Sequence, residues 1–231
     1  MAKLIGIGVG PGDPELLTLK AIKALKEIDI LLLPTGRAGG ESEAYGIACN
    51  YIPEQVTQIK RHFPMTSNTV EMLGAIQEIA AEIIPMIQAG KTIGFITLGD
   101  PMLYSTYGYL KKFVELECEV ATIPGIMSFG AIASGTNHIL CEGDTPLVVY
   151  PCTDDLSRLD ALLAIGSALV LMKVFRQFEG VKAKLIANGL ADSCVIASNY
   201  GKPNEVLYRS LEDVNPENLS YFTTILVNPK A

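Results

Sequence analysis

The amino-acid sequence predicts an α/β protein with two domains, the first built on a mainly parallel sheet and the second on a mixed sheet. Three observations support this fold class. Short apolar runs alternate with longer segments of helical period along most of the 231 residues. Gly and Pro follow several of these runs directly, as is typical where a parallel strand turns into a helix. Near the end of the chain the helical spacers are lost, which favours antiparallel pairing there.

The first domain is expected to cover residues 1–141. Apolar runs at 3–9 and 28–34 enclose a segment whose apolar residues recur at helical spacing, and together they predict a βαβ unit with parallel, buried strands. The alternation continues with a helix near 42–52, a strand at 55–63, a helix near 69–88, a strand at 91–99, a helix near 103–115, a strand at 119–124 and a helix near 127–135.

A polar, glycine-containing stretch at 136–145 marks the expected boundary, so the second domain is expected to cover residues 142–231. After this stretch the alternation restarts with a strand at 146–151, a helix near 154–164, a strand at 168–174, a helix near 177–188 and a strand at 194–198. Two further strands, at 205–211 and 222–228, have no helix-sized spacer of clear period between them. The second sheet is therefore predicted to be mixed.

The composition is that of a globular protein, with 49% hydrophobic and 19% charged residues. The 18 Lys and Arg against 25 Asp and Glu give a formal charge of −7, which argues against nucleic acid or an anionic membrane as the main partner. An anionic small substrate remains compatible with this charge, because a cleft can be locally basic on an acidic protein.

The five cysteines are scattered and form no C-x-x-C motif, which indicates reduced thiols and a cytoplasmic location. No apolar run approaches the roughly 18 residues that a membrane span needs. The apolar start of the chain meets "PGDPE" at once, so we expect no signal peptide. With only two histidines, we expect no metal centre held by the protein itself.

The first turn of interest is "GVGPGDPELLT" at residues 8–18, where glycines follow an apolar run. Pro11 interrupts the G-x-G-x-x-G pattern, and Asp13 is placed to cap a helix at the position where a pyrophosphate would bind. We therefore exclude a dinucleotide here, and the Walker pattern is absent as well. Two interpretations stay open: the glycines only make a tight turn, or they let the backbone approach a flat, roughly neutral ligand.

Two more turns follow strands in the same domain. In "TLGDPMLYSTYGYL" (97–110), Gly99 permits unusual backbone angles, and Asp100 either accepts hydrogen bonds from a ligand or caps the next helix. The third turn is "PGIMS" at 124–128. Because ligands of α/β sheets gather at the carboxyl ends of strands, the three turns predict a ligand cleft at one edge of the first sheet.

The segments "GVGPGDPELLT", "GDPMLYST" and "PGIMSFGAIAS", in this order, resemble the tetrapyrrole (corrin and porphyrin) methylase family, which uses S-adenosylmethionine. The branch that methylates precorrin-2 or cobalt-factor II at C-20, in cobalamin biosynthesis, resembles the chain most in "LLLPTGRAGGES", "GFITLGDPMLYST", "ALVLMKVFRQF" and "YFTTILVN". The resemblance implies two α/β domains with the cofactor in a cleft between them, and a homodimer. It leaves open whether the substrate carries cobalt.

The resemblance also implies cofactor contacts in both domains. In the first domain and at the start of the following helix they are Pro11, Gly99, Asp100, Leu103, Met127 and Ser128. In the second domain they are Met172, Asn199, Tyr200, Thr224 and Ile225.

A tetrapyrrole substrate of this family carries several carboxylates, so the resemblance calls for cations around the cleft. Arg suits bidentate carboxylate binding better than Lys. The candidates are Arg37, Lys60, Arg61, Lys173 and Arg176, with His62 as a further cation. Lys60 and Arg61 are equally compatible with solvated surface charges.

Methyl transfer from a sulfonium to a ring carbon needs alignment above all, an effect worth roughly 7–11 kcal/mol. A proton must also be managed, and the candidates are Tyr104, Tyr107, Asp100 and Lys173, with His138 as a weaker one. Any cobalt would arrive inside the substrate. Alternatives with the same fold are another ring position, uroporphyrinogen, or the modified histidine of a translation factor; an alternative from another class is a nucleotide-sensing module without turnover.

Overall fold

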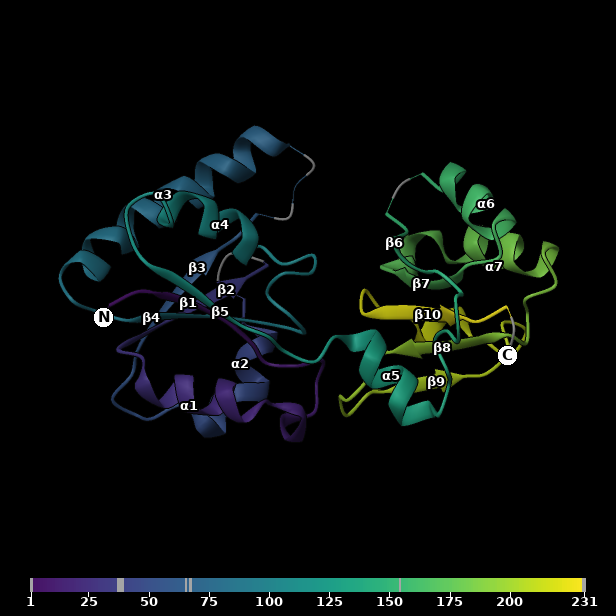
Figure 1. The fold of residues 1–231 in the computed structure, drawn as a ribbon, viewed down its shortest axis with the longest axis horizontal. Helices are drawn as coiled ribbons and strands as arrows, with labels where there is room; N and C mark the ends of the chain where they lie inside the picture. Colours follow the sequence, from purple (N-terminus) through teal and green to yellow (C-terminus); the bar gives the residue numbers. More distant parts are fainter. Residues whose placement is uncertain (1, 37–39, 65, 67, 154, 230–231) are drawn as a thin grey trace. The chain divides into compact units, whose positions relative to one another are not determined.

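The computed structural model describes residues 2–36, 40–64, 66, 68–153 and 155–229. Its contacts divide the chain into two compact units, Met1–Met127 and Ser128–Ala231 (Figure 1). Each unit holds one five-stranded sheet with helices on both faces, which confirms the predicted α/β fold class.

The first sheet is entirely parallel, as predicted, with the strand order β3-β2-β4-β1-β5. Its strands are β1 (Leu4–Gly8), β2 (Ile30–Thr35), β3 (Thr57–His62), β4 (Ile93–Thr97) and β5 (Val120–Ile123). All five residues of β1 are buried because helices cover both faces of the sheet. Because β4, β1 and β5 are parallel and adjacent in this order, their carboxyl ends are neighbours at one edge of the sheet.

The helices of the first unit are η1 (Pro14–Leu16), α1 (Leu19–Glu27), α2 (Glu43–Ala48), η2 (Cys49–Tyr51), α3 (Thr69–Gln88) and α4 (Tyr107–Val114). Helices α1 and α2 cover one face of the sheet, and α3 and α4 cover the other (Figure 1). Successive residues of β2 point to opposite faces of the sheet. Leu31 and Leu33 pack with α1 and α2, and Leu32 packs with α3 and α4.

The turn between β4 and α4 is longer than predicted, because α4 begins at Tyr107 rather than near residue 103. The Ser105 hydroxyl accepts a hydrogen bond from the Tyr107 amide at 3.2 Å and donates one to the Thr97 hydroxyl at 3.0 Å. The Leu103 amide donates to the carbonyl of Asp100 at 3.3 Å. These bonds hold the intervening residues in a defined, non-helical turn.

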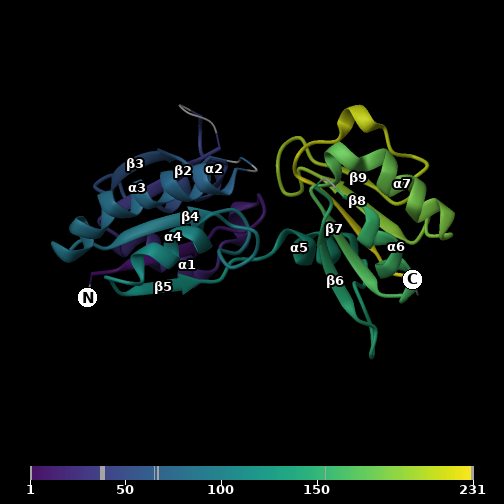
Figure 2. The same cartoon turned by 90° about the horizontal axis from the view of Figure 1, so that it is seen from above.

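The second sheet is mixed, as predicted, with the order β6-β7-β10-β8-β9. Its strands are β6 (Leu147–Pro151), β7 (Ala168–Met172), β8 (Cys194–Ser198), β9 (Val206–Tyr208) and β10 (Thr223–Val227). Strands β6 and β7 pair in parallel, and the other pairs are antiparallel. Figure 2 shows β6 and β9 at opposite edges of this sheet.

The helices of the second unit are α5 (Ser128–Thr136), α6 (Ser157–Ala164), η3 (Val174–Gln177), α7 (Phe178–Ala187) and η4 (Pro216–Asn218). The chain divides between Met127 and Ser128, earlier than the boundary that the sequence predicted at 141–142. The reason is packing: Ile132 of α5 is buried against Val170 and Leu226 of the second sheet. Helix α5 therefore belongs to the second unit, although its residues precede the polar stretch.

Two thiols lie in the core of the second unit, and they predict how stability depends on pH. Burial raises the pKa of Cys152 to about 12 and that of Cys194 to about 12, with a further contribution from Asp192 at the second. Each thiol thus holds its proton more tightly in the folded than in the unfolded chain. Its contribution to stability is complete below the unfolded pKa and is lost as the pH rises towards 12.

We therefore expect Cys152→Ala and Cys194→Ala to flatten the alkaline loss of stability. Each thiol should account for about 1–2 kcal/mol of the decrease in unfolding free energy between pH 7.5 and pH 10. Urea unfolding at the two pH values measures this, and Cys49→Ala, at a partly exposed position, controls for loss of a thiol as such. An identical pH dependence in all variants would contradict the expectation.

Candidate functional site

The three glycine-containing turns that the sequence singled out meet at the carboxyl edge of the first sheet. Strand β1 lies between β4 and β5, so the turns that follow these strands are neighbours. The Gly99 amide donates to the Gly10 carbonyl at 2.8 Å, and the Gly10 amide donates to the Gly99 carbonyl at 3.4 Å. This backbone pair extends the contact of β1 with β4 beyond the strands. The predicted gathering of the turns is confirmed.

The glycines serve two different purposes there. A Cβ on Gly8 would lie 2.5 Å from the Gly125 nitrogen and 2.6 Å from the Gly99 oxygen, and a Cβ on Gly125 would overlap that same oxygen. At these two positions glycine lets the turns close on one another. Gly99 differs: its φ is +61°, and the nearest atom to an added Cβ, the Ile126 oxygen, is 3.9 Å away. The close packing at Gly8 agrees with the tight-turn interpretation of the glycines in residues 8–18, and their approach to a ligand stays a prediction. The backbone at Gly99 faces open space.

Asp100 is buried, with 7% of its surface exposed, and both carboxylate oxygens accept backbone hydrogen bonds. Oδ1 accepts from the Met102 amide at 2.8 Å within its own turn. Oδ2 accepts from the Gly125 amide at 3.0 Å, in the turn after β5. The carboxylate therefore links two turns of the protein, and this geometry does not support the catalytic role that the sequence suggested for Asp100.

The two tyrosines proposed for catalysis have different environments. Tyr107 is fully buried: its ring packs against Gly6, its hydroxyl donates to the Ala121 carbonyl at 2.9 Å, and it bonds the Thr122 hydroxyl at 3.0 Å. This environment gives Tyr107 a structural role in the core, and its catalytic role stays a prediction. Tyr104, by contrast, is 49% exposed in the turn after β4. Sequence reasoning did not separate them because the start of α4 was placed too early.

Backbone strain marks two candidates. Among the described residues, positive φ angles outside glycine occur at Tyr104 (50°), Lys173 (59°), Asn137 (53°) and Asn199 (54°). Asparagine tolerates this region, whereas the conformation costs a bulky or long side chain about 1–3 kcal/mol. Such strain is concentrated at functional sites. Tyr104 and Lys173 were both singled out from the sequence for other reasons.

The other cofactor candidates of the first unit lie in or beside the three turns. Pro11 is buried directly after Gly10, and Leu103 is partly buried in the turn after β4. Met127 is partly buried at the end of the turn after β5, and Ser128 is the first residue of α5 in the second unit.

The second-unit candidates lie mainly on the face of the sheet that α5 covers. Thr224 of β10 is the register partner of Met172 of β7, and Met172 and Tyr200 pack into the same apolar cluster as α5. The Tyr200 hydroxyl occupies the place where a side chain at Gly135 of α5 would lie. Ile225 is completely buried in the cluster on the opposite face, so its side chain is directed away from this group.

Asn199 uses its side chain to close the turn after β8. Its Oδ1 accepts from the Ser220 hydroxyl at 2.8 Å, and its Nδ2 donates to the Asn204 carbonyl at 3.5 Å. The Ser220 hydroxyl also accepts from that of Ser198 at 3.2 Å. With only 8% of its surface exposed, Asn199 directs its amide group to hydrogen bonds within the protein.

The predicted cations of the first unit do not form one group. Lys60 and Arg61 are neighbours on β3, so their side chains point to opposite faces of the sheet. Arg61 forms a bidentate ion pair with Glu82 of α3, with its Nε 2.6 Å from Oε2 and its Nη2 on Oε1. Arg61 therefore has a structural partner. Lys60 and His62 are exposed on the other side, and Arg37 lies outside the described residues.

In the second unit, Lys173 and Arg176 flank the end of β7. Lys173 is partly buried, and this burial lowers the pKa of its ammonium group. Arg176 is exposed beside a shallow cavity of about 250 Å³ that it lines with Phe175 and Leu219.

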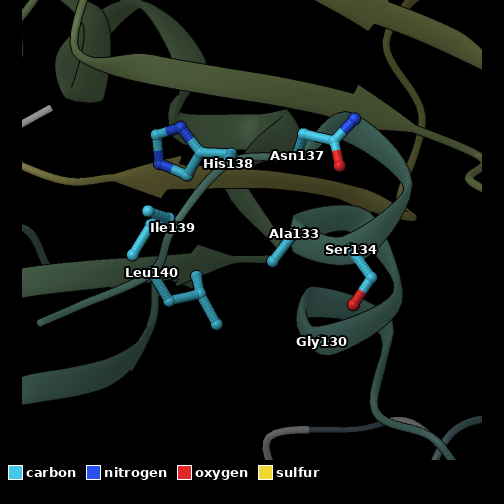
Figure 3. A pocket seen from close by; sticks show the side chains of 7 residues that line it. All are labelled: Gly130, Ala133, Ser134, Asn137, His138, Ile139 and Leu140. Atoms are coloured by element: carbon cyan, nitrogen blue, oxygen red, sulfur yellow. The ribbon is translucent and has the colours of Figure 1, made fainter.

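A larger cavity of about 410 Å³ lies at the end of α5 (Figure 3). Its lining residues are Gly130, Ala133, Ser134, Asn137, His138, Ile139 and Leu140. The Nε2 atom of His138 is buried without a hydrogen-bond partner in the part of the chain that the structure describes. Burial and the charge of Arg209 lower the pKa of His138, which favours a neutral imidazole. Its catalytic role stays a prediction.

Across the described ranges, no group of three or more His, Cys, Asp or Glu side chains is placed to hold a metal ion. No helix within those ranges combines the length and apolarity needed to cross a membrane.

The chain is thus a two-unit α/β protein whose three glycine-containing turns lie at the carboxyl edge of a parallel sheet, here called the turn edge. This is the edge at which α/β proteins commonly bind ligands. The family model for Tetrapyrrole (Corrin/Porphyrin) Methylases matches residues 3–214. The chain belongs to this family.

Two relatives are similar over nearly their whole length. A cobalt-precorrin-2 C(20)-methyltransferase of Salmonella typhimurium is 38% identical over 227 residues, which are 98% of this chain and 96% of that protein. A precorrin-2 C(20)-methyltransferase of a Sinorhizobium species is 30% identical over 235 residues, 98% of this chain and 95% of that protein.

Solved structures share the fold at lower identity. A cobalt precorrin-4 methyltransferase of cobalamin biosynthesis superposes with a TM-score of 0.74 at 20% identity, covering 98% of this chain and 94% of that one. The uroporphyrin-III C-methyl transferase from Thermus thermophilus, complexed with S-adenosylhomocysteine, gives 0.66 at 18% identity, covering 99% and 93%. These two likenesses concern the fold.

Proposed function

We propose that this protein transfers a methyl group from S-adenosylmethionine to C-20 of precorrin-2 or of its cobalt-containing form, a step of cobalamin biosynthesis. The observation that carries the proposal is the full-length similarity to two proteins named for C-20 methylation, at 38% and 30% identity. The similarity extends across both units, so it includes the turns after β1, β4 and β5.

The turn edge fits S-adenosylmethionine better than a nucleotide phosphate. The Asp13 carboxylate accepts the Glu15 amide at 2.8 Å and so makes the start of η1 negative, where an anion would otherwise bind. The open backbone at Gly99 suits a flat, uncharged adenosine group. In the first unit we assign cofactor contacts to Pro11, Gly99, Leu103 and Met127. In the second unit we assign them to Ser128, Met172, Thr224 and Tyr200, and to the backbone of Asn199 and Ile225.

S-adenosylmethionine, when bound, supplies a methyl group activated by a sulfonium. Transfer of that group to a ring carbon would release S-adenosylhomocysteine and a proton of the ring system, so this chain's residues would have to align the two molecules and take up the proton. Tyr104 projects from a turn held by several hydrogen bonds, so it can orient a phenol at the substrate. Burial lowers the pKa of Lys173, so a larger fraction of its amine is neutral and available to accept a proton. We propose Tyr104 and Lys173 for charge stabilisation or proton uptake.

For the carboxylates of the substrate we propose Lys60, Arg176 and Arg37, and we give Arg61 a structural role because Glu82 neutralises it. Lys60 and Arg176 are exposed, and each is free to move towards a carboxylate at the surface.

The test is methyl transfer with purified protein and ¹³C-methyl-labelled S-adenosylmethionine. We expect the label at C-20 of precorrin-2 or its cobalt complex, read by NMR, and none on uroporphyrinogen. Label at another ring position would reject the C-20 assignment. Stoichiometric binding without S-adenosylhomocysteine formation would favour the nucleotide-sensing alternative.

The same assay examines Tyr104. Tyr104→Phe is expected to lower kcat by about 100-fold if the hydroxyl handles a proton or charge. Tyr109→Phe is the matched control, because Tyr109 on α4 is also an exposed tyrosine, at 40%, and its substitution should change kcat by less than about twofold. Equal kcat in the two variants would remove Tyr104 from the mechanism.

We also propose, from the family resemblance, that the protein works as a homodimer in the cytoplasm. Light scattering on the purified protein measures the mass, and a monomer at enzymatically active concentrations would reject the dimer.

A further inference from the structure

We propose that Asp100 is a positioning residue that ties the turn after β4 to the turn after β5, so that the cofactor site is presented as one rigid edge. This inference rests on the proposed function and names the residue that organises the site. It assigns the carboxylate to the protein's own backbone rather than to the ligand or to a proton.

The first argument is the reach of the carboxylate. Its bond to the Met102 amide, 2.8 Å long, fixes the turn to which Asp100 belongs, and its bond to the Gly125 amide, 3.0 Å long, reaches a turn from another strand. Strands β4 and β5 are not neighbours, because β1 lies between them. The second bond therefore crosses the end of β1. Hydrogen bonds to a charged acceptor are about twice as strong as neutral ones, and burial of Asp100 shields these two from water.

The second argument is the glycine packing under this bond. A side chain on Gly8, the last residue of β1, would lie 2.5 Å from the very nitrogen that donates to Asp100. A side chain on Gly125 would overlap the Gly99 carbonyl. Glycine at both positions lets the two turns approach across β1, and Asp100 then holds them together.

The third argument is that the two turns joined by Asp100 present exposed side chains. Met102 is 64% exposed, Tyr104 is 49% exposed and Ile126, which follows Gly125, is 36% exposed. These three side chains come from both turns, and Asp100 bonds the backbone of Met102 and of the residue before Ile126. Their exposure at the edge suits a flat, largely apolar ring, so fixing Asp100 fixes the surface that such a ring would meet.

The positioning role and a catalytic role make opposite kinetic predictions. Asp100→Asn keeps the size of the side chain and one acceptor, but its NH₂ group faces a backbone N–H where an oxygen was. As a positioning residue, Asp100 should affect KM for the cofactor and leave kcat at saturation within about threefold. As a proton acceptor, it should lower kcat and change the pH profile while KM stays constant.

The structure offers a matched control at the opposite end of the same sheet. The Asp29 carboxylate, before β2, accepts the Thr92 amide, before β4, at 2.8 Å. It is also an aspartate that ties two strands through a backbone amide, but at their amino ends, away from the turn edge. Asp29→Ala therefore reproduces the loss of such a bond without disturbing the site.

The experiment compares Asp100→Ala, Asp100→Asn and Asp29→Ala in the full-length protein by calorimetric titration with S-adenosylhomocysteine and by amide hydrogen exchange. For both Asp100 variants we expect a Kd about 10- to 100-fold higher and exchange at Met102 and Gly125 at least about tenfold faster. Asp29→Ala should lose thermal stability with a Kd change below about threefold.

Three results would overturn the inference: unchanged exchange at Met102 and Gly125, an unchanged Kd, or a fall in kcat with constant KM. If Asp100→Ala does not fold, Asp100→Asn carries the same comparison. If the unsubstituted protein binds S-adenosylhomocysteine but methylates no tetrapyrrole, the proposed function fails while the exchange and affinity results still decide the role of Asp100.

Discussion

Gly125→Ala is expected to lower the free energy of unfolding by about 3–5 kcal/mol and to weaken S-adenosylhomocysteine binding together with stability. The added methyl group would overlap the Gly99 carbonyl oxygen and approach the backbone of Gly8. All of these neighbours are backbone atoms, so no side chain can rotate away. The turn after β5 must therefore move away from β1, which also breaks the bond from the Gly125 amide to Asp100.

Urea unfolding followed by circular dichroism measures the first effect and calorimetric titration measures the second. Gly74→Ala in α3 is the control, because nothing lies within 4 Å of the added Cβ and alanine favours a helix by up to about 1 kcal/mol. Equal stability of the two variants would show that the turns do not pack as described.

Tyr107→Ala is expected to cost about 3–5 kcal/mol of stability, because the side chain is large and has no exposed surface. Its ring lies 5.7 Å from that of Phe95 and packs against Gly6, so a cavity would open beside the sheet. Tyr107→Phe should cost only about 1 kcal/mol, for the lost hydrogen bond to the Ala121 carbonyl.

Tyr107→Phe also distinguishes the two tyrosines of the "YSTY" segment. The kcat of Tyr107→Phe per folded molecule should equal that of the unsubstituted enzyme. The kcat of Tyr104→Phe should be about 100-fold lower. Methyl-transfer rates measured well below the melting temperature of each variant make this comparison. A large loss of kcat in Tyr107→Phe would return this residue to the catalytic machinery.

The arrangement of the three turns could be predicted from the sequence because each turn is a local feature. Glycine and proline directly after buried runs predicted turns after β1, β4 and β5, and parallel strands necessarily place such turns at one edge. The cap at Asp13 was predicted in the same way, and its carboxylate does accept the Glu15 amide, although the helix it starts is the short η1 and α1 begins later, at Leu19.

Other features needed the tertiary structure because they depend on contacts between residues far apart in the chain. Arg61 has a partner in Glu82, 21 residues later, and no local pattern reveals this pair. Asp100 reaches Gly125 across a third strand, and α5 joins the second unit because Ile132 finds its apolar partners there.

The sequence by itself determined the elements, the parallel and mixed sheets and the shared edge, since hydrophobic period and turn chemistry are properties of neighbouring residues. Only the tertiary structure decided which polar side chains remain available to a ligand. Tyr107 and Tyr104 have the same hydroxyl and stand three positions apart in the chain, yet one lies under Gly6 and the other is half exposed. Burial and long-range hydrogen bonds made that difference, and both arise only when the strands assemble.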